Sequence, residues 1–408
     1  MNTRSSDSNK AIWIAGLATL LAAFQLTIIN TYVVIFLQED LLTAIIIITI
    51  IISLRNLLQI FLRVPLGELS QIIGRKPLLL LGHFSFTLAL IFLFFAFDWF
   101  FVFLSIIFVA FGMSCFWPSL FAYVSDFTPK TFGHSNGRIF QMGDVGTIFG
   151  SLISSLLLDE LLWGLRNLFG IIAGIGVFSG VITIFLLPEG LIAKDRRQVD
   201  SILQAIKESI IFMARSFKNI TMSNHLAEVY AFQFFLSFIE FAAATFLPVL
   251  IVSKGYTRGE VAEIVFWSTI AIIWFKPYLG QITDKFNFIP TISSFLIISS
   301  LTMLVFLIIQ TYWLLVLVYI ILNGSLITSY IAANGETARR ASFEQRGTAL
   351  GALGVYVSFG RTTSTIVLGP VWEVFGLFGV FLLTGFGVLI IAALLFFFMR
   401  YRTSKRQN

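Results

Sequence analysis

The sequence predicts an all-helical integral membrane protein whose twelve transmembrane helices form two pseudo-symmetric six-helix bundles. Of the 408 residues, 58% are hydrophobic and 12% are charged, about half the charged fraction of a typical soluble domain. Long apolar runs recur from end to end without the alternation of barrel strands, which favours helices. This composition excludes a soluble globule and a disordered chain, and the single cysteine, Cys115, excludes a disulfide scaffold.

Each predicted span is an apolar stretch long enough to cross a bilayer as a helix, which takes about 20 residues. The first stretch is too long for the apolar core of a signal peptide, so we expect it to be retained. The spans cover roughly 11–37, 43–66, 78–97, 100–123, 137–158, 163–187, 227–251, 259–281, 289–309, 312–334, 348–369 and 377–399.

The 27 Lys and Arg residues predict the orientation of these spans. With both termini in the cytoplasm, the external segments contain only Arg166, Lys254 and Arg258, while Arg55 and Arg361 fall within spans. All other basic residues then lie inside, which is the positive-inside pattern. We therefore expect a multi-pass protein of the cell membrane, and the net charge of +6 does not indicate a nucleic-acid partner.

The longest polar segment, residues 188–225, divides the chain into two halves of six spans each. Apolar residues recur at helical spacing from Ile202 to Phe217, which predicts a short amphipathic helix at the membrane surface. The expected organisation is an N-terminal bundle at 1–187, a cytoplasmic central loop at 188–225 and a C-terminal bundle at 226–408.

The two halves also resemble each other at a nearly fixed offset of 213 or 214 residues. Parallel six-helix repeats around a central pathway are a known plan of secondary transporters. The matching positions are Arg63 with Lys276, Leu66 with Leu279, Gly67 with Gly280, Gly133 with Gly347, and Gly137 with Gly351.

The segment Gly67–Pro77 resembles the loop motif G-x-L-x-D-x-x-G-R-K/R of the major facilitator superfamily, and the six-plus-six layout is similar over nearly the whole chain. The resemblance implies that the glycines permit a tight turn and close helix contact. It also implies that the basic residues bind acidic groups at neighbouring helix ends and latch the outward-open state. The implied positions are Gly67, Gly74, Arg75 and Lys76, with Asp126 as an acidic partner.

This motif departs from the family pattern in both halves. Its aspartate is Gln71 here, and a glutamine cannot supply the carboxylate of a charge relay. The second copy keeps Gly280, Asp284 and Lys285 but has Asn287 where the pattern has glycine. We therefore expect any latch to depend on the C-terminal half.

A second motif, found in the fifth helix of drug–proton antiporters, is present in degraded form. Gly137, Gly146 and Gly150 have its spacing, but Ser151 replaces its proline and serines replace its last glycines. Close helix packing by small residues is the favoured interpretation, with drug export as the alternative.

Four ionisable residues lie in mid-span: Arg55, Asp144, Glu240 and Arg361. Such groups are costly in a bilayer and usually face a partner or a hydrated cavity. Glu240 and Arg361 lie at similar depth, roughly 20 Å from the cytoplasmic helix ends, so the resembled fold makes an ion pair reasonable. Arg55 and Asp144 differ in depth by roughly 7 Å, part of which a long arginine side chain can span.

Uncharged polar residues follow the same helix faces and predict a hydrated passage. In the alternative interpretation, these residues only join helices and never touch cargo. The positions are Gln25, Asn30, Gln233, Asn323 and Tyr330.

Together these patterns predict a secondary transporter that moves a small solute by alternating access, with Glu240 as the proton or substrate carboxylate. The sequence has no phosphate-binding glycine loop and its histidines lack metal-ligand spacing, so we expect no enzyme activity, cofactor or metal. The expected partners are the solute, the bilayer and protons, and we expect a monomer. A drug or metabolite exporter and a non-transporting membrane sensor of the same fold remain alternatives.

Overall fold

The computed structural model describes residues 2–127, 132–188, 211, 226–340 and 346–407, and this part of the chain is almost entirely helical. The predicted surface helix in the central segment lies outside the described residues. The helices are α1 (Asn2–Ile35), η1 (Phe36–Asp40), α2 (Ile45–Ile72), α3 (Arg75–Phe94), α4 (Trp99–Phe127), α5 (Phe132–Ser155), η2 (Leu156–Glu160), α6 (Leu165–Leu186), α8 (Ala227–Ser253), α9 (Arg258–Lys285), α10 (Phe288–Ile308), α11 (Tyr312–Arg340) and α12 (Arg346–Gln407).

Every predicted span overlaps one of these helices; the first and fifth spans continue into η1 and η2, and the last two both lie on α12. Ten of the described helical stretches are long and apolar enough to cross a membrane, and α9 is not among them. The α12 stretch Ala352–Ala393 would measure about 60 Å if straight, twice the thickness of the bilayer core. It bends at Gly376, whose positive φ of 65° is open to glycine without strain, so α12 combines two helices. The chain is a multi-pass membrane protein.

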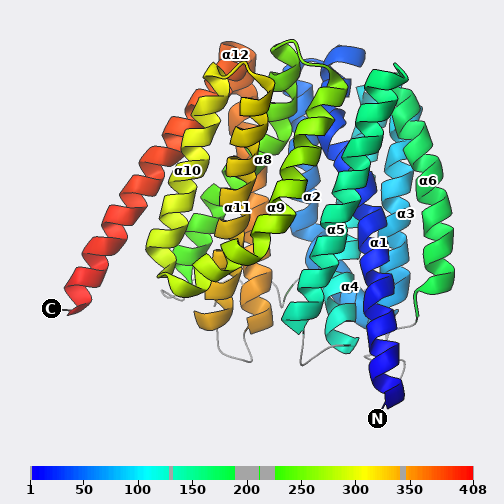
Figure 1. Cartoon of the computed structure of the whole chain (residues 1–408), viewed down its shortest axis with the longest axis horizontal. Coiled ribbons are helices and arrows are strands. Elements are labelled where there is room, and N and C mark those ends of the chain that lie inside the picture. Colours follow the sequence, from blue (N-terminus) through cyan, green and yellow to red (C-terminus); the bar gives the residue numbers. More distant parts are fainter. Residues whose placement is uncertain (1, 128–131, 189–210, 212–225, 341–345, 408) are drawn as a thin grey trace. The chain divides into compact units, whose positions relative to one another are not determined.

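The described helices form two compact units. Unit 1 contains residues 1–43, 54–215 and 257–266, and unit 2 contains the remainder, so α2 and α9 contribute to both. In unit 1, α3 packs against α4 and α6, and α1 packs against α5 (Figure 1). In unit 2, α10 packs against α11 and α12, and α8 packs against α12. The predicted boundaries at 187 and 226 differ from this division and stay a prediction.

In each unit, one glycine explains how an equivalent pair of helices comes close. On α5, any side chain at Gly146 would overlap the backbone carbonyl of Leu20 on α1. On α12, any side chain at Gly360 would overlap the backbone carbonyl of Phe234 on α8. Both residues of the second pair stand 214 positions after those of the first, so the internal repeat extends to backbone packing.

The antiporter-like glycines fit this packing role. Gly150, one turn beyond Gly146, lies against the backbone of Phe24, whereas Gly137 has open space around it. The spacing that resembles an antiporter motif is therefore explained at two of its three positions by the contact of α5 with α1.

The superfamily motif is more helical than its sequence suggests. We expect a loop from Gly67 onwards, but α2 continues to Ile72 and the turn is confined to the next two residues. Gly74 has a φ of 107°, which explains the need for glycine at this position. The second copy also differs from the expected loop, because α9 continues to Lys285 and includes Gly280 and Asp284. Helix-forming residues extend both helices beyond the apolar core that defines a span.

Candidate functional site

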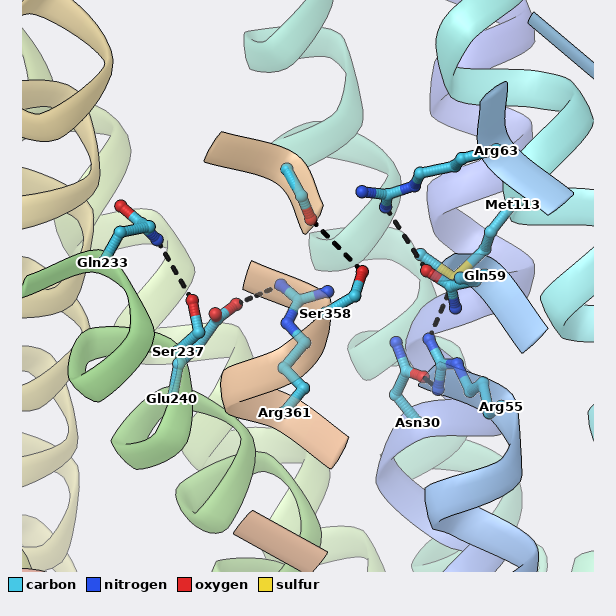
Figure 2. A network of polar contacts seen from close by, with 11 residues as sticks. Asn30, Arg55, Gln59, Arg63, Met113, Gln233, Ser237, Glu240, Ser358 and Arg361 are labelled. Carbon is cyan, nitrogen blue, oxygen red and sulfur yellow. Dashed lines mark hydrogen bonds and ion pairs between the residues drawn. The ribbon is translucent and has the colours of Figure 1, made fainter. Parts of the chain in front are cut away.

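The predicted ion pair of unit 2 is present and joins α8 to α12. Nη2 of Arg361 on α12 lies 2.7 Å from Oε1 of Glu240 on α8 (Figure 2). The side chain of Arg361 is 19% exposed and that of Glu240 is 38% exposed in the protein alone. A charge-assisted contact of this length compensates both charges. The carboxylate of Glu240 is the more exposed of the two groups.

The surroundings of this pair hold further hydrogen-bonding capacity. On α8, Nε2 of Gln233 donates to Oγ of Ser237 at 3.0 Å (Figure 2). Ser237 lies about one turn before Glu240 on this helix. Oε1 of Gln233 and Nε of Arg361 are buried and have no hydrogen-bond partner among the described residues. Buried polar atoms without partners are costly unless water or a ligand satisfies them. The described residues therefore leave hydrogen-bonding capacity of Gln233 and Arg361 unused.

Unit 1 contains a second arginine network, with different partner chemistry. Arg55 on α2 is buried, and its Nη1 donates to Oδ1 of Asn30 on α1 at 2.6 Å. Its Nη2 lies 3.1 Å from the sulfur of Met113 on α4. The same sulfur lies 3.5 Å from Nε2 of Gln59, and Arg63 donates to Oε1 of Gln59 at 3.3 Å (Figure 2). Three helices thus converge on Arg55.

Asp144 is half-buried on α5 of the same unit. The structure gives Arg55 the partners just described, and the pairing of Arg55 with Asp144 stays a prediction.

Gln25 belongs to a packed polar cluster inside unit 1. Its Oε1 accepts a hydrogen bond from Thr87 at 3.0 Å, and its Nε2 lies 3.3 Å from Nε2 of His83. His83 also contacts Oγ of Ser179 at 2.9 Å, so the cluster joins α1, α3 and α6. Gln25 therefore has hydrogen-bond partners on neighbouring helices of unit 1, and its place on a passage stays a prediction.

The remaining predicted polar positions have separate surroundings. Nδ2 of Asn323 on α11 donates to Oγ of Ser268 on α9 at 2.9 Å. Tyr330, two turns further along α11, is exposed. These two residues do not share a contact with Glu240 or Arg361 in the described hydrogen bonds.

The motif after α2 forms the ion pair that its resemblance implies. Nε of Arg75 lies 3.2 Å from Oδ2 of Asp126, near the end of α4. Nη1 of Arg75 also donates to Ser70 on α2, which ties the turn to both helices. Lys76 is half-buried and Lys285 is exposed, while the side chains of Gln71 and Asp284 lie outside the described part.

Sequence reasoning missed Met113 and His83 as members of these networks. Met113 lies in an apolar run and carries no charge, so a search for ionisable residues passes over it. His83 stands far from other histidines, and only the packing of three helices shows that it binds Gln25.

Comparisons with known proteins agree on the fold. A structure of a POT family transporter in complex with a thioalcohol-conjugated peptide superposes with a TM-score of 0.76 at 14% identity, covering 96% of each chain. A point mutant of the peptide transporter POT in complex with sulfate gives 0.77 at 13% identity, covering 95% of this chain and 93% of that one. A point mutant of the nucleoside transporter NupG gives 0.77 at 16% identity, covering 96% and 99%.

A search of curated proteins found no match to this sequence. A family model, in contrast, matches residues 15–365, which is most of the chain, and its family is the Major Facilitator Superfamily. The fold, the repeat and this match lead to one conclusion: the chain belongs to the Major Facilitator Superfamily and is a secondary transporter.

Proposed function

We propose that the protein is a proton-coupled transporter of a small anionic or zwitterionic solute, and that Glu240 carries the coupled proton. The observation that carries the proposal is the 2.7 Å contact between Glu240 and Arg361. Protonation of Glu240 removes its negative charge and frees Arg361 for an anionic group of the solute. Proton and solute then bind together, because each favours the state in which the pair is open.

The proposal also covers the oligomeric state of the transporter, its membrane, its orientation and its class of solute. We propose a monomer in the cell membrane. We infer that both termini lie in the cytoplasm, since only Arg166, Lys254 and Arg258 are basic in the segments assigned outside. The solute class is supported by the chemistry of Arg361 and, as an analogy, by relatives of the fold whose structures hold a peptide conjugate or 5-aminolevulinic acid. Such solutes carry a carboxylate that an arginine binds well.

The first experiment identifies a solute and then separates coupling from binding. A thermal-shift screen of the purified protein with dipeptides, 5-aminolevulinic acid, nucleosides and sulfate selects ligands, because a ligand of the native state raises its stability. Proteoliposomes then measure uphill uptake under a pH gradient and exchange without a gradient. We expect Glu240→Gln to abolish uphill uptake and to retain exchange.

Glu373→Gln is the matched control, since Glu373 is an exposed carboxylate on α12, the helix that carries Arg361. It should leave both activities unchanged. Intact accumulation in Glu240→Gln would refute the coupling role.

A double variant tests whether the pair only joins two helices. Each single change leaves one charge without its partner, which costs several kcal/mol when that charge is buried. Glu240→Gln combined with Arg361→Gln removes both charges and should recover thermal stability. We expect this double variant to fold and to remain uncoupled, whereas full recovery of uphill uptake would reduce the pair to a structural contact.

A further inference from the structure

A groove lies on the surface of unit 1, between α6 and the end of α3. The two helices pack side by side (Figure 1), and the groove between them has a volume of about 550 Å³. One wall is formed by Phe94 and Phe95 at the end of α3, and the other by one face of α6 from Trp163 to Val177. Both helices are long and apolar enough to cross a membrane, so the open side of the groove meets the bilayer.

The polar groups of the groove lie together at the start of α6. Among the described lining residues, only Asn167 has an amide or charged side chain. Arg166 stands four positions before Gly170, a lining residue, and therefore continues the same row of the helix surface toward its start. From Asn167 to Val177 the helix rises about 15 Å, which is half the thickness of the bilayer core. The groove is therefore as long as one leaflet is deep and is polar at one end.

The aromatic residues around Arg166 place this polar end at the surface of the membrane. Phe95, Phe97, Trp99 and Trp163 are all exposed, and aromatic rings of this kind gather where lipid headgroups meet hydrocarbon. The remaining exposed side chains further along α6, such as Phe178 and Phe185, are apolar. Arg166 and Asn167 therefore lie at headgroup depth, with the apolar part of the groove below them.

The guanidinium of Arg166 is available to an anion. Its Cζ lies 5.5 Å from the centre of the Phe97 ring, and this stacking leaves its N–H donors unused. Among the described residues, no carboxylate forms an ion pair with Arg166. Asp98, the residue after Phe97, accepts the backbone N–H of Phe100 at 3.0 Å and so caps the start of α4. A phosphate group matches the forked donors of an arginine.

The two glycines of the groove favour a thin occupant over a second helix. Gly170 and Gly174 have the spacing at which membrane helices approach each other closely. An added side chain at Gly170 would overlap the ring of Phe94, whereas Gly174 has nothing within 4 Å. A partner helix needs both positions, but α3 already covers the first. An acyl chain needs only the open position.

We propose that this groove binds one anionic diacyl phospholipid. One acyl chain lies along Gly174, and the phosphate accepts hydrogen bonds from Arg166 and Asn167. An anionic headgroup is preferred to a zwitterionic one, because it brings no cation of its own to compete with Arg166. The site belongs to unit 1 alone, is separate from Glu240 and does not depend on the proposed proton coupling.

Native mass spectrometry of the purified, delipidated protein tests the proposal by counting bound lipids during titration. The two lipids compared are phosphatidylglycerol and phosphatidylcholine with identical acyl chains. We expect one saturable site that binds phosphatidylglycerol roughly three- to tenfold more tightly, the size of one partly exposed charge-assisted contact. Arg166→Gln should reduce this preference to near one, and Arg166→Lys should keep part of it, because the charge remains without the fork.

A second variant tests the acyl-chain part of the site. Gly174→Leu fills the open groove and should remove the saturable site for both lipids, while thermal stability without lipid is retained because the space is empty. Gly137→Leu is the matched control, since Gly137 on α5 also has nothing within 4 Å. It should bind both lipids as the parent does.

Three results would overturn the proposal. The first is equal affinity for the two lipids in the parent and in Arg166→Gln. The second is displacement of phosphatidylglycerol by an equal concentration of inorganic phosphate, which would reduce the site to an anion contact. The third is a dimer of the chain that Gly174→Leu dissociates while lipid binding persists, which would make the groove an interface between two copies. The measurement uses no solute and no proton gradient, so its outcome is independent of the role of Glu240.

Discussion

Two helices contribute to both units, and their docking contacts differ in chemistry. In unit 1, the start of α9 meets α5 through Ser155 and Glu263, next to the ion pairs of Arg258 with the two acidic residues that end η1. In unit 2, the start of α2 meets α12 at Gly369, which stands 214 residues after Ser155. There the neighbour is Thr49, and an added Cβ on Gly369 would lie 2.5 Å from its hydroxyl oxygen.

A hydroxyl contact completes the docking in unit 2. Oγ of Ser53 lies 2.5 Å from Oγ1 of Thr365. Equivalent places in a duplicated chain therefore use charged groups in one unit and small, closely packed groups in the other. Charged contacts in water tolerate separation and respond to salt, whereas close packing responds to volume. The two dockings should fail under different perturbations.

The largest effect should come from added volume in unit 2. Gly369→Leu places a side chain where Thr49 already lies, and overpacking of this kind costs about 1–3 kcal/mol or more. We expect a clear loss of thermal stability in detergent. In a Cys115→Ala background, we also expect faster maleimide labelling of a cysteine placed at buried Ile48, in the docked part of α2.

Two controls define this prediction. Gly174→Ala adds a methyl group where nothing lies within 4 Å, so it should leave stability nearly unchanged. Thr49→Ala combined with Gly369→Ala should recover much of the loss that Gly369→Ala causes alone. If Gly369→Leu is as stable as the parent, α2 and α12 are not closely packed at this place.

An intermediate effect should come from ionic strength, and it should separate the two dockings in one experiment. Raising salt screens the partly exposed pairs of Arg258, each worth up to about 1 kcal/mol, and leaves the uncharged contacts of Ser53 intact. Ala262 is buried in the stretch of α9 that belongs to unit 1. Labelling at Ala262→Cys should therefore rise with salt, while labelling at Ile48→Cys should not. Equal responses at the two positions would mean that charge does not distinguish the dockings.

The sequence predicts part of this arrangement because some signals are local. Apolar length locates the spans, and matching depth on two resembled neighbour helices predicts the pair of Glu240 with Arg361. The docking of Arg258 has no such signal, because its partners Glu39 and Asp40 stand more than 200 residues away. At the level of sequence, Arg258 contributes only to the distribution of basic residues that predicts the orientation of the spans. The repeated ends of α1 and α5, each an acidic pair before two leucines, were the available clue.

The contacts of Arg55 show the same limit. Asn30 and the sulfur of Met113 contact it, and its pairing with Asp144 stays a prediction. Neither of the two contact residues is ionisable, so the identity of these contacts depends on how α1, α2 and α4 pack. The predicted start of the motif loop at Gly67 is wrong for another reason. Polar residues such as Ser70 continue α2 beyond the apolar run that predicts the span.

The smallest effect should come from removing one hydroxyl in unit 2. Ser53→Ala deletes the contact with Thr365 and the 2.6 Å contact with the backbone carbonyl of Thr49, but Thr365 keeps its hydrogen bond to the carbonyl of Thr362 at 3.1 Å. A single neutral hydrogen bond is worth about 0.5–1.5 kcal/mol, so we expect a small drop in thermal stability and a slight rise in labelling at Ile48→Cys. Ser105→Ala is a control of opposite sign, because Oγ of Ser105 is buried without a partner among the described residues and its removal should be neutral or stabilising. Equal losses in the two variants would assign the effect of Ser53 to packing volume rather than to its hydrogen bond.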